Sequence, residues 1–447
     1  MNYIFALTGF KGILFLAVTI LIAVATLLGH RRGRGVLFSF ITGSAVAFIM
    51  LHFAAMISQG SGGQNPFFIA FAVVLIIFLW KFLFGPWDSR VKAEVLGVFL
   101  FWIAAHIMEK NTLRENMATF LAILIALIPA GIWCLLFLRY HSRRISILLL
   151  TFFSGMLSTA PILFYDYVVR QGAELHFFLF RITPANFLQS SRTFVAGALT
   201  GEPGVITASV VTTLVSFALV GVIEEWSKHW VTRKSDPAYF TSVNDVMQLS
   251  IIAGIGFAFA ENIVNPNYFI SFVTNYLVNP PSPQWGLFLA SIFGRSIITN
   301  MVHITCSGVL GYFYGLAFFA KPALEEDRAH GRRHRLIVFI HTLTGISRIE
   351  LYREAMMMQG LLFAILLHSA FDIAVSLPET LPSHPQTIGD LFHIGGPLAG
   401  VNLVLLPALV YVFGGFSLLT FLFHRKSDLK EFGYRLRQEV FVRGKPA

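Results

Sequence analysis

Two acidic residues and a lysine are grouped in a strongly apolar stretch of this 447-residue chain. Glu224 and Glu225 are adjacent, and Lys228 follows them at spacings of four and three residues, so its ammonium can reach either carboxylate across one helical turn. One glutamate held by the lysine would leave the other free to act as a base. A surface cap at the end of an apolar helix would give the same pattern, and the sequence leaves both interpretations open.

A third glutamate lies in the segment SIIAGIGFAFAENIV. Gly254, Phe257, Ala258 and Glu261 share one helical face there, because they recur at spacings of three, four and seven residues. Small residues on that face let a second helix approach closely, so Glu261 is predicted to face protein rather than lipid. The neighbouring Asn262 is predicted to hydrogen-bond across helices, and Asn262 and Phe257 are both given accessory roles.

Two histidines lie in later apolar segments. His303 is followed by Gly308 and Gly311 in a small-residue stripe, and alone it fits a packing role as well as a chemical one. His368 and Asp372 are four residues apart on one helical face, where the carboxylate can orient the imidazole or both groups can face one centre. Ionisable residues inside membrane helices are costly and mark sites of proton, ion or chemical work.

These segments together supply three glutamates, two histidines and one aspartate. The set is sufficient for a water-activating base with an orienting acid and an oxyanion donor. It also suffices for a zinc site of three protein ligands and a water, with Glu225, Glu261, His303 and His368 as candidate ligands. The sequence has no HExxH motif, which excludes the zincin arrangement. Zinc and metal-free chemistry both stay open.

The elements that position these groups are predicted to be membrane helices. Hydrophobic residues make up 56% of the sequence and charged residues 13%, against about 25% charged in soluble domains, which predicts an all-α polytopic membrane protein. A helix that crosses the hydrocarbon core needs about 20 apolar residues. A transmembrane bundle of about eleven helices is therefore expected, at 12–29, 36–58, 66–84, 95–108, 118–139, 146–168, 204–230, 242–265, 296–320, 357–376 and 397–423.

The basic residues indicate orientation rather than nucleic-acid binding. Although the formal charge is +10, most of the 33 lysines and arginines lie in alternate loops between the apolar runs. The positive-inside rule then places the N-terminus outside and the C-terminus inside, with the lipid bilayer as a partner. Only Lys11 precedes the first run, and Arg31, Arg32 and Arg34 follow it, which is typical of a membrane helix and not of a signal peptide.

Two further expectations come from local composition. Cys134 and Cys306 both lie in apolar runs, so neither a disulfide nor a cysteine metal site is expected. The stretch from Gln171 to Gly204 mixes aromatic and polar residues and is predicted to lie along the interface as a short amphipathic helix.

The four polar segments resemble those of the PrsW family of intramembrane proteases, which are relatives of the CAAX prenyl proteases and of bacteriocin-processing membrane enzymes. The family pattern is EExxK, a Phe-x-x-x-Glu-Asn helix, a histidine helix with glycines, and His-x-x-x-Asp. In this chain it reads Glu224-Glu225-x-x-Lys228, Phe257-x-x-x-Glu261-Asn262, His303 with Gly308 and Gly311, and His368-x-x-x-Asp372. The resemblance covers roughly residues 146–377.

This resemblance implies cleavage of a membrane-anchored protein substrate in a bacterial cytoplasmic membrane, with anti-sigma factors as the best-known substrate class. By analogy with the CAAX-type relatives, Glu224 would activate water, and His368 with Asp372 would stabilise the oxyanion. The resemblance does not decide whether a metal takes part.

The predicted domains follow from where the polar segments begin. They are an N-terminal five-helix membrane region (1–145), a protease core (146–424) and a basic cytoplasmic tail (425–447). The first region has no buried acidic residue comparable to Glu224, so it is expected to be dispensable for the chemistry.

Glu224 and Glu261 are predicted to lie at different depths in the membrane. Glu224 lies about ten residues from the turn near 234–241, and Glu261 lies about twenty residues from it, so a rise of 1.5 Å per residue predicts a difference of order 10–15 Å. Helix tilt or a broken helix would remove that difference. Otherwise Glu261 would belong to the surroundings of the site or to a substrate path.

A proton- or ion-coupled transporter is the alternative interpretation, because buried carboxylates and histidines serve both functions. A protease needs one compact cluster with water beside a base, whereas a transporter needs a path or two gates. The order of the motifs favours the protease. Convergence of Glu224, His303 and His368 in space would favour it further.

Overall fold

The computed structural model describes residues 34–58, 87–108, 112–138, 145–170, 175–177, 180–182, 210–235, 240–264, 269–270, 272–273, 285–381 and 383–425. The predicted spans at 12–29 and 66–84, and the tail beyond residue 425, lie outside these described residues.

The chain divides into two compact units. The first contains Met1–Glu109 with Arg144–Phe153, and the second contains Lys110–Arg143 with Ser154–Ala447. This division differs from the sequence boundary at residue 145, because helix α5 (Leu113–Leu138) belongs to the unit that carries the polar motifs.

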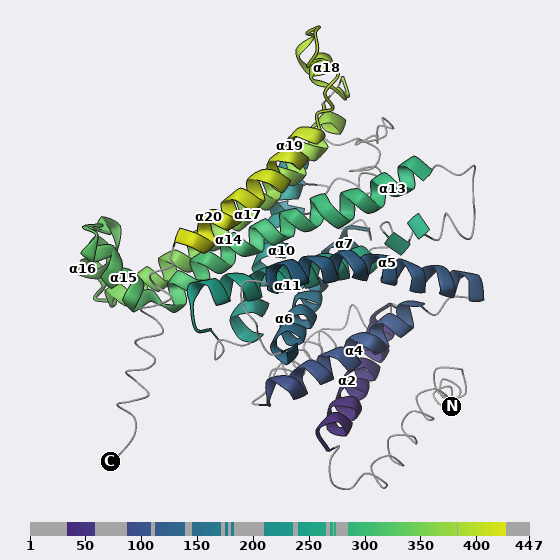
Figure 1. The fold of residues 1–447 in the computed structure, drawn as a ribbon, viewed down its shortest axis with the longest axis horizontal. Coiled ribbons are helices and arrows are strands. Elements are labelled where there is room, and N and C mark those ends of the chain that lie inside the picture. Colours follow the sequence, from purple (N-terminus) through teal and green to yellow (C-terminus); the bar gives the residue numbers. More distant parts are fainter. Residues whose placement is uncertain are drawn as a thin grey trace. The chain divides into compact units, whose positions relative to one another are not determined.

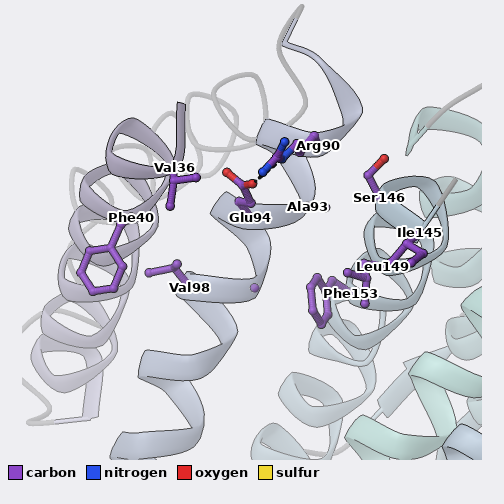
Figure 2. A pocket seen from close by; sticks show the side chains of 11 residues that line it. Val36, Phe40, Arg90, Ala93, Glu94, Val98, Ile145, Ser146, Leu149 and Phe153 are labelled. Atoms are coloured by element: carbon purple, nitrogen blue, oxygen red, sulfur yellow. Dashed lines mark hydrogen bonds and ion pairs between the residues drawn. The ribbon is translucent and has the colours of Figure 1, made fainter. Parts of the chain in front are cut away.

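The first unit packs α2 (Arg34–Ser58) against α4 (Ser89–Met108) and includes the start of α6 (Ile145–Leu157). A Cβ atom at Gly43 would lie 2.6 Å from the backbone oxygen of Val95, so only glycine lets α2 and α4 approach this closely. Side chains of all three helices surround a cavity of about 490 Å³ (Figure 2). Its one charged feature is the Arg90–Glu94 pair of α4, in which the two side chains lie 2.9 Å apart.

The second unit contains most of the described helices (Figure 1). In chain order they are α5, α7 (Ala160–Arg170), α10 (Val210–Ser235), α11 (Val243–Val264), α13 (Trp285–Phe293), η3 (Gly294–Thr299), α14 (Asn300–Phe318), α15 (Ala320–Ala329), α16 (Arg335–Thr344), α17 (Arg348–Thr380), α18 (Ile388–Phe392), α19 (Leu405–Leu409), η4 (Val410–Gly414) and α20 (Gly415–Arg425). The elements η3 and η4 are π-helical turns that join α13 to α14 and α19 to α20.

Helices α11 and α14 form the centre of this unit. Buried residues make up 94% of the apolar part of α11 and 89% of the span that contains α14, against 28% for α5 and for the span that ends in α20. Helix α11 carries the buried polar residues Asn244, Asp245 and Gln248, which need protein rather than lipid around them. Glycine permits the close packing, because a Cβ at Gly311 would lie 2.8 Å from the Cα of Met247. Figure 1 shows α14 running beside α17 and α20.

The fold class predicted from the sequence is confirmed. Six helical spans in the described part of the chain are long and apolar enough to cross a membrane: Leu113–Leu138, Ile145–Tyr165, Val243–Val264, Phe288–Phe318, Arg348–Ser376 and Leu405–Arg425. The total of about eleven helices and the N-out orientation stay predictions.

Two differences from the predicted elements are local. Leu175–Phe177 (β1) and Phe180–Ile182 (β2) form a short antiparallel pair in a stretch that was expected to be helical, since its aromatic residues also suit strands. A helix was expected to begin at residue 296. The observed helical segment begins earlier, at Trp285, because the π-turn η3 keeps the chain helical through the polar residues between α13 and α14.

The connection between α14 and α17 is fixed by one buried carboxylate. Asp327 of α15 accepts hydrogen bonds from Arg332 (3.3 Å) and from the hydroxyl of Tyr352 (3.3 Å), and it lies 3.1 Å from Nε2 of His334. These contacts hold α15 and the residues before α16 against the start of α17.

Candidate active site

Helix α10 contributes a buried carboxylate pair and the lysine beside it. Lys228 Nζ donates a hydrogen bond to Glu225 Oε1 at 2.7 Å and lies 3.6 Å from Glu224 Oε2. The exposed fractions are 4% for Glu224, 0% for Glu225 and 1% for Lys228. The group therefore lies inside the helical bundle and is not a surface cap of the helix.

A close approach of α17 brings His368 onto this pair. A Cβ at Gly221 of α10 would collide with the hydroxyl of Ser369, so glycine allows the two helices to pack directly together. Nδ1 of His368 lies 2.7 Å from Glu225 Oε1. Because an ionised carboxylate can only accept, Nδ1 carries the proton of this bond. The other ring nitrogen, Nε2, faces Glu224 Oε2 at 3.5 Å and Asp372 Oδ2 at 3.7 Å.

His303 of α14 links the α10 group to α11. Its Nδ1 lies 3.0 Å from Lys228 Nζ and its Nε2 lies 3.1 Å from Glu261 Oε2. An ammonium can only donate, so Nδ1 accepts from Lys228 and Nε2–H donates to Glu261. The ring of Phe257 supports both groups, with its centroid 4.0 Å from Lys228 Nζ and 5.2 Å from that of His303. The His303 and His368 rings meet edge to face at 5.1 Å.

Glu261 is joined to the cluster in spite of its different height along the bundle. The imidazole of His303 stands between Glu261 (3.1 Å) and Glu224 (3.9 Å), so a ring and two side chains span the separation. Arg295, at the start of the π-turn η3, binds the other oxygen of Glu261 at 3.2 Å. The sequence analysis missed Arg295, although an arginine inside a long apolar helix is itself a signal of a buried polar site.

Two carboxylate oxygens of the cluster, Glu224 Oε2 and Glu225 Oε2, have no hydrogen-bond partner among the described residues, and the first lies at the centre. Glu224 Oε2 is buried and lies 3.5 Å from His368 Nε2, 3.6 Å from Lys228 Nζ and 3.9 Å from His303 Nδ1. These separations are too long for good hydrogen bonds, and they are close to the spacing of donor atoms around a bound metal ion. A buried charged oxygen without a partner is costly, so this arrangement favours a bound species at that position.

The donor set fits a divalent metal. Single donor atoms of Glu224, His303 and His368 lie within 4.8 Å of one another. Tetrahedral zinc with bonds of about 2.0–2.1 Å needs donors about 3.3 Å apart, so the separations of 3.5 Å and 3.9 Å from Glu224 need a small contraction, and the two imidazole nitrogens, which lie within 4.8 Å, must also approach each other. Each histidine also has a carboxylate on its other nitrogen, which is the usual way in which metal-binding imidazoles are oriented.

The net charge of the cluster also favours a bound cation. Among the described residues, the cluster has four carboxyl groups and two fixed cations. If every carboxyl group is ionised and the histidines are neutral, the cluster has a net charge of −2. The carboxyl groups are those of Glu224, Glu225, Glu261 and Asp372, and the cations are Lys228 and Arg295. A dication or two protons would balance that negative charge.

Three residues depart from the expectations drawn from sequence. Cys306 was not expected near a metal, but its sulfur forms a second donor group with Glu225 and His368. Asn262 is buried, and its Oδ1 has no hydrogen-bond partner among the described residues, so this oxygen makes no hydrogen bond across helices. Glu261, a candidate ligand, falls in neither donor group and instead contacts His303 from outside.

Comparison with known families gives one match. A family model described as PrsW family intramembrane metalloprotease matches residues 143–392, which is more than half of the chain. No curated protein and no solved structure matches the chain. The matched range contains every polar residue of the cluster.

Proposed function

Since the chain belongs to the PrsW family of intramembrane metalloproteases, and is therefore a membrane-embedded protease, we propose that Glu224 activates the water that cleaves the peptide bond. The observation that carries this proposal is the unpartnered Oε2 of Glu224, buried between nitrogens of His303, His368 and Lys228. A water hydrogen-bonded to this oxygen would have a base beside it and hydrogen-bond donors close by.

The reaction needs a proton to move from water to the leaving nitrogen. Glu224 takes the proton as the water oxygen bonds to the carbonyl carbon, and returns it to the nitrogen as the C–N bond breaks. In a site without metal, His368 is held by Glu225 and has Asp372 beside its Nε2, so a proton on Nε2 would be donated to the carbonyl oxygen as negative charge develops there. His303 and Glu261 hold Lys228 and the rest of the cluster in place.

We propose zinc as the metal that the family description implies, because a carboxylate and two imidazoles are the donors that catalytic zinc prefers. Glu224, His303 and His368 would hold it, in which case His368 Nε2 would bind the metal in place of a proton and His303 Nδ1 would exchange its hydrogen bond from Lys228 for the metal. Zinc supplies a Lewis acid that polarises the carbonyl and acidifies bound water. Glu225 and Glu261 would keep the two imidazoles oriented through their outer nitrogens.

The test is Glu224→Gln, which keeps the size of the side chain but removes its ability to accept a proton. Cleavage of a membrane-tethered reporter by purified protein in liposomes should be lost, and zinc content should be measured on the same sample. Retained zinc assigns Glu224 to the base, whereas loss of zinc assigns it to the metal ligands and leaves Asp372 as the carboxylate beside His368. Full activity of this variant would remove Glu224 from the mechanism.

A matched control is Glu350→Gln on the same helix as His368. Glu350 is exposed and bonds only to Ser347 among the described residues, so its loss should leave cleavage and zinc content unchanged. Chelation followed by zinc addition completes the test, since activity that is lost and then restored requires the metal.

The substrate is a membrane-embedded protein, as the family implies. We propose that this substrate is a membrane-anchored regulator of the anti-sigma-factor class, cleaved in a bacterial cytoplasmic membrane. In this proposal residues 146–424 form the protease core, residues 1–145 form a region that gates or selects substrate, and residues 425–447 form a cytoplasmic tail. The compact form of the cluster supports proteolysis over the transporter alternative, which would need a path or two gates. Proton flux through the purified protein without any cleavage would reverse that choice.

A further inference from the structure

A second cavity, of about 510 Å³, lies at one end of the helices that carry the cluster. Its walls come from α10, α14 and α17, with Arg233, Lys234, Tyr314, Phe318, Arg353 and Met357 among the lining residues. Arg233 follows Glu224 by nine residues and Tyr314 follows His303 by eleven, so a rise of 1.5 Å per residue places this cavity roughly 15 Å from the cluster. It is a separate site on the same three helices.

The cavity carries three positive charges. Arg233, Lys234 and Arg353 are exposed, and no described acidic side chain forms an ion pair with any of them. Lys234 Nζ lies 5.2 Å from the centroid of the Trp230 ring, a contact that leaves its N–H groups available as donors. Three like charges around one space repel each other, and an anion bound between them would relieve that repulsion.

The other walls are apolar. Ala317, Phe318 and Met357 line the cavity beside the cations, so a ligand that fills it must combine an anionic group with hydrocarbon. Arg233 and Lys234 lie in the last turn of α10, and Arg353 lies near the start of the apolar span Arg348–Ser376, where a lipid headgroup is expected.

We propose that this cavity binds an anionic phospholipid, with its phosphate between Arg233, Lys234 and Arg353 and its acyl chains against Phe318 and Met357. Guanidinium groups bind phosphate oxygens in a bidentate manner, and basic pockets between transmembrane helices on the cytoplasmic side select anionic headgroups. The bound lipid would tie together the ends of the helices that carry Glu224, His303 and His368. This assignment does not depend on proteolysis.

The cavity of the first unit provides a contrast. It is also lined by apolar side chains and one arginine, but Arg90 lies 2.9 Å from Glu94 and is neutralised within its own helix (Figure 2). An anionic headgroup gains little there, because the cation is already paired. Selectivity for anionic lipid is therefore assigned to the cavity at Arg233 and Arg353.

The experiment uses the full-length protein in nanodiscs of phosphatidylcholine with a small fraction of phosphatidylglycerol. The triple variant Arg233→Gln, Lys234→Gln, Arg353→Gln removes the cavity charges. A matched triple variant, Lys321→Gln, Arg333→Gln, Arg335→Gln, removes the same charge from exposed positions around α15 and α16. Native mass spectrometry counts the phosphatidylglycerol molecules that stay bound, and thermal unfolding reports the stabilisation by added lipid.

Wild-type protein and the matched variant should retain phosphatidylglycerol over phosphatidylcholine, and the cavity variant should bind it roughly a hundredfold more weakly, at about fivefold for each lost cation. Equal retention by the cavity variant and wild type would overturn the proposal. So would displacement of the lipid by millimolar inorganic phosphate, which would make the site one for free phosphate. Binding of a glutamate-rich peptide in place of phosphatidylglycerol would overturn it too, and would give the site to an acidic protein segment.

Discussion

Glu225 Oε1 and His368 Nδ1 lie 2.7 Å apart, although 143 positions separate the two residues in the sequence. The same oxygen also accepts a hydrogen bond from Lys228 at 2.7 Å. One carboxylate oxygen thus sets the proton position on the imidazole and holds the ammonium of its own helix. Both contacts are charge-assisted and buried, which makes them strong and makes their loss costly.

Glu225→Gln should reduce cleavage ten- to a hundredfold without removing the nucleophile, because His368 and Lys228 lose the charge that orients them. Initial rates on a membrane-tethered reporter and the midpoint of thermal unfolding should be measured together. Unchanged rates would show that the orientation of His368 does not matter to the reaction.

Lys228→Met should bind zinc more tightly than wild type. The ammonium lies 3.0 Å from His303 Nδ1 and competes with a metal for that nitrogen, and its removal also makes the site more negative. Cleavage should fall, but less than in Glu224→Gln, because the unpartnered oxygen of Glu224 remains. Zinc titration against a competing chelator gives the affinity. Weaker binding in Lys228→Met would indicate that the lysine supports the metal site instead.

Arg295→Met should lower cleavage by leaving Glu261 without its cation, so that His303 loses a fixed partner. A buried carboxylate deprived of its ion-pair partner costs about 3–5 kcal/mol in comparable cases. Arg295→Lys should restore part of the activity, since it returns the charge without the planar guanidinium. Equal activities of the two variants would argue that Arg295 serves packing alone.

Gly254→Ala should destabilise the protein by about 1–3 kcal/mol, because the new Cβ would lie 3.0 Å from the backbone oxygen of His303 and against the side chain of Ser307. Gly131→Ala on α5 is the control, since nothing lies within 4 Å of a Cβ there. Thermal unfolding in detergent compares the two. A larger loss in the control would show that the packing of α11 on α14 is looser than the structure indicates.

Much of the candidate site could be predicted from the sequence because each segment has a helical period. The spacing of Glu224, Glu225 and Lys228 placed them on adjoining faces of one helix, and the structure brings these side chains together with His303 and His368. Their catalytic roles stay a proposal. The fold class followed from hydropathy, since long apolar runs have few alternatives to a membrane helix.

Other features depend on contacts that no local pattern contains. Heights measured along helix axes ignored the reach of side chains, so Glu261 was placed too far away until His303 was seen between it and Glu224. The packing of α5 on the core also depends on distant partners: Trp133 donates to the backbone oxygen of Ser296 at 2.9 Å, and Gln248 donates to that of Phe137 at 2.7 Å.

The π-turn at Gly294–Thr299 makes the site depend on chain length as well as on residue type. Such a turn holds one more residue than an α-helix would in the same rise. Because the turn absorbs the extra residue, deleting one residue there would restore a regular helix with α13 and α14 nearly in register, but Arg295, which lies inside the turn, would lose the position from which it reaches Glu261. Exchange of apolar side chains along α13 is thus a mild change, whereas a one-codon deletion in this turn would remove the Arg295–Glu261 ion pair and leave Glu261 without its cation.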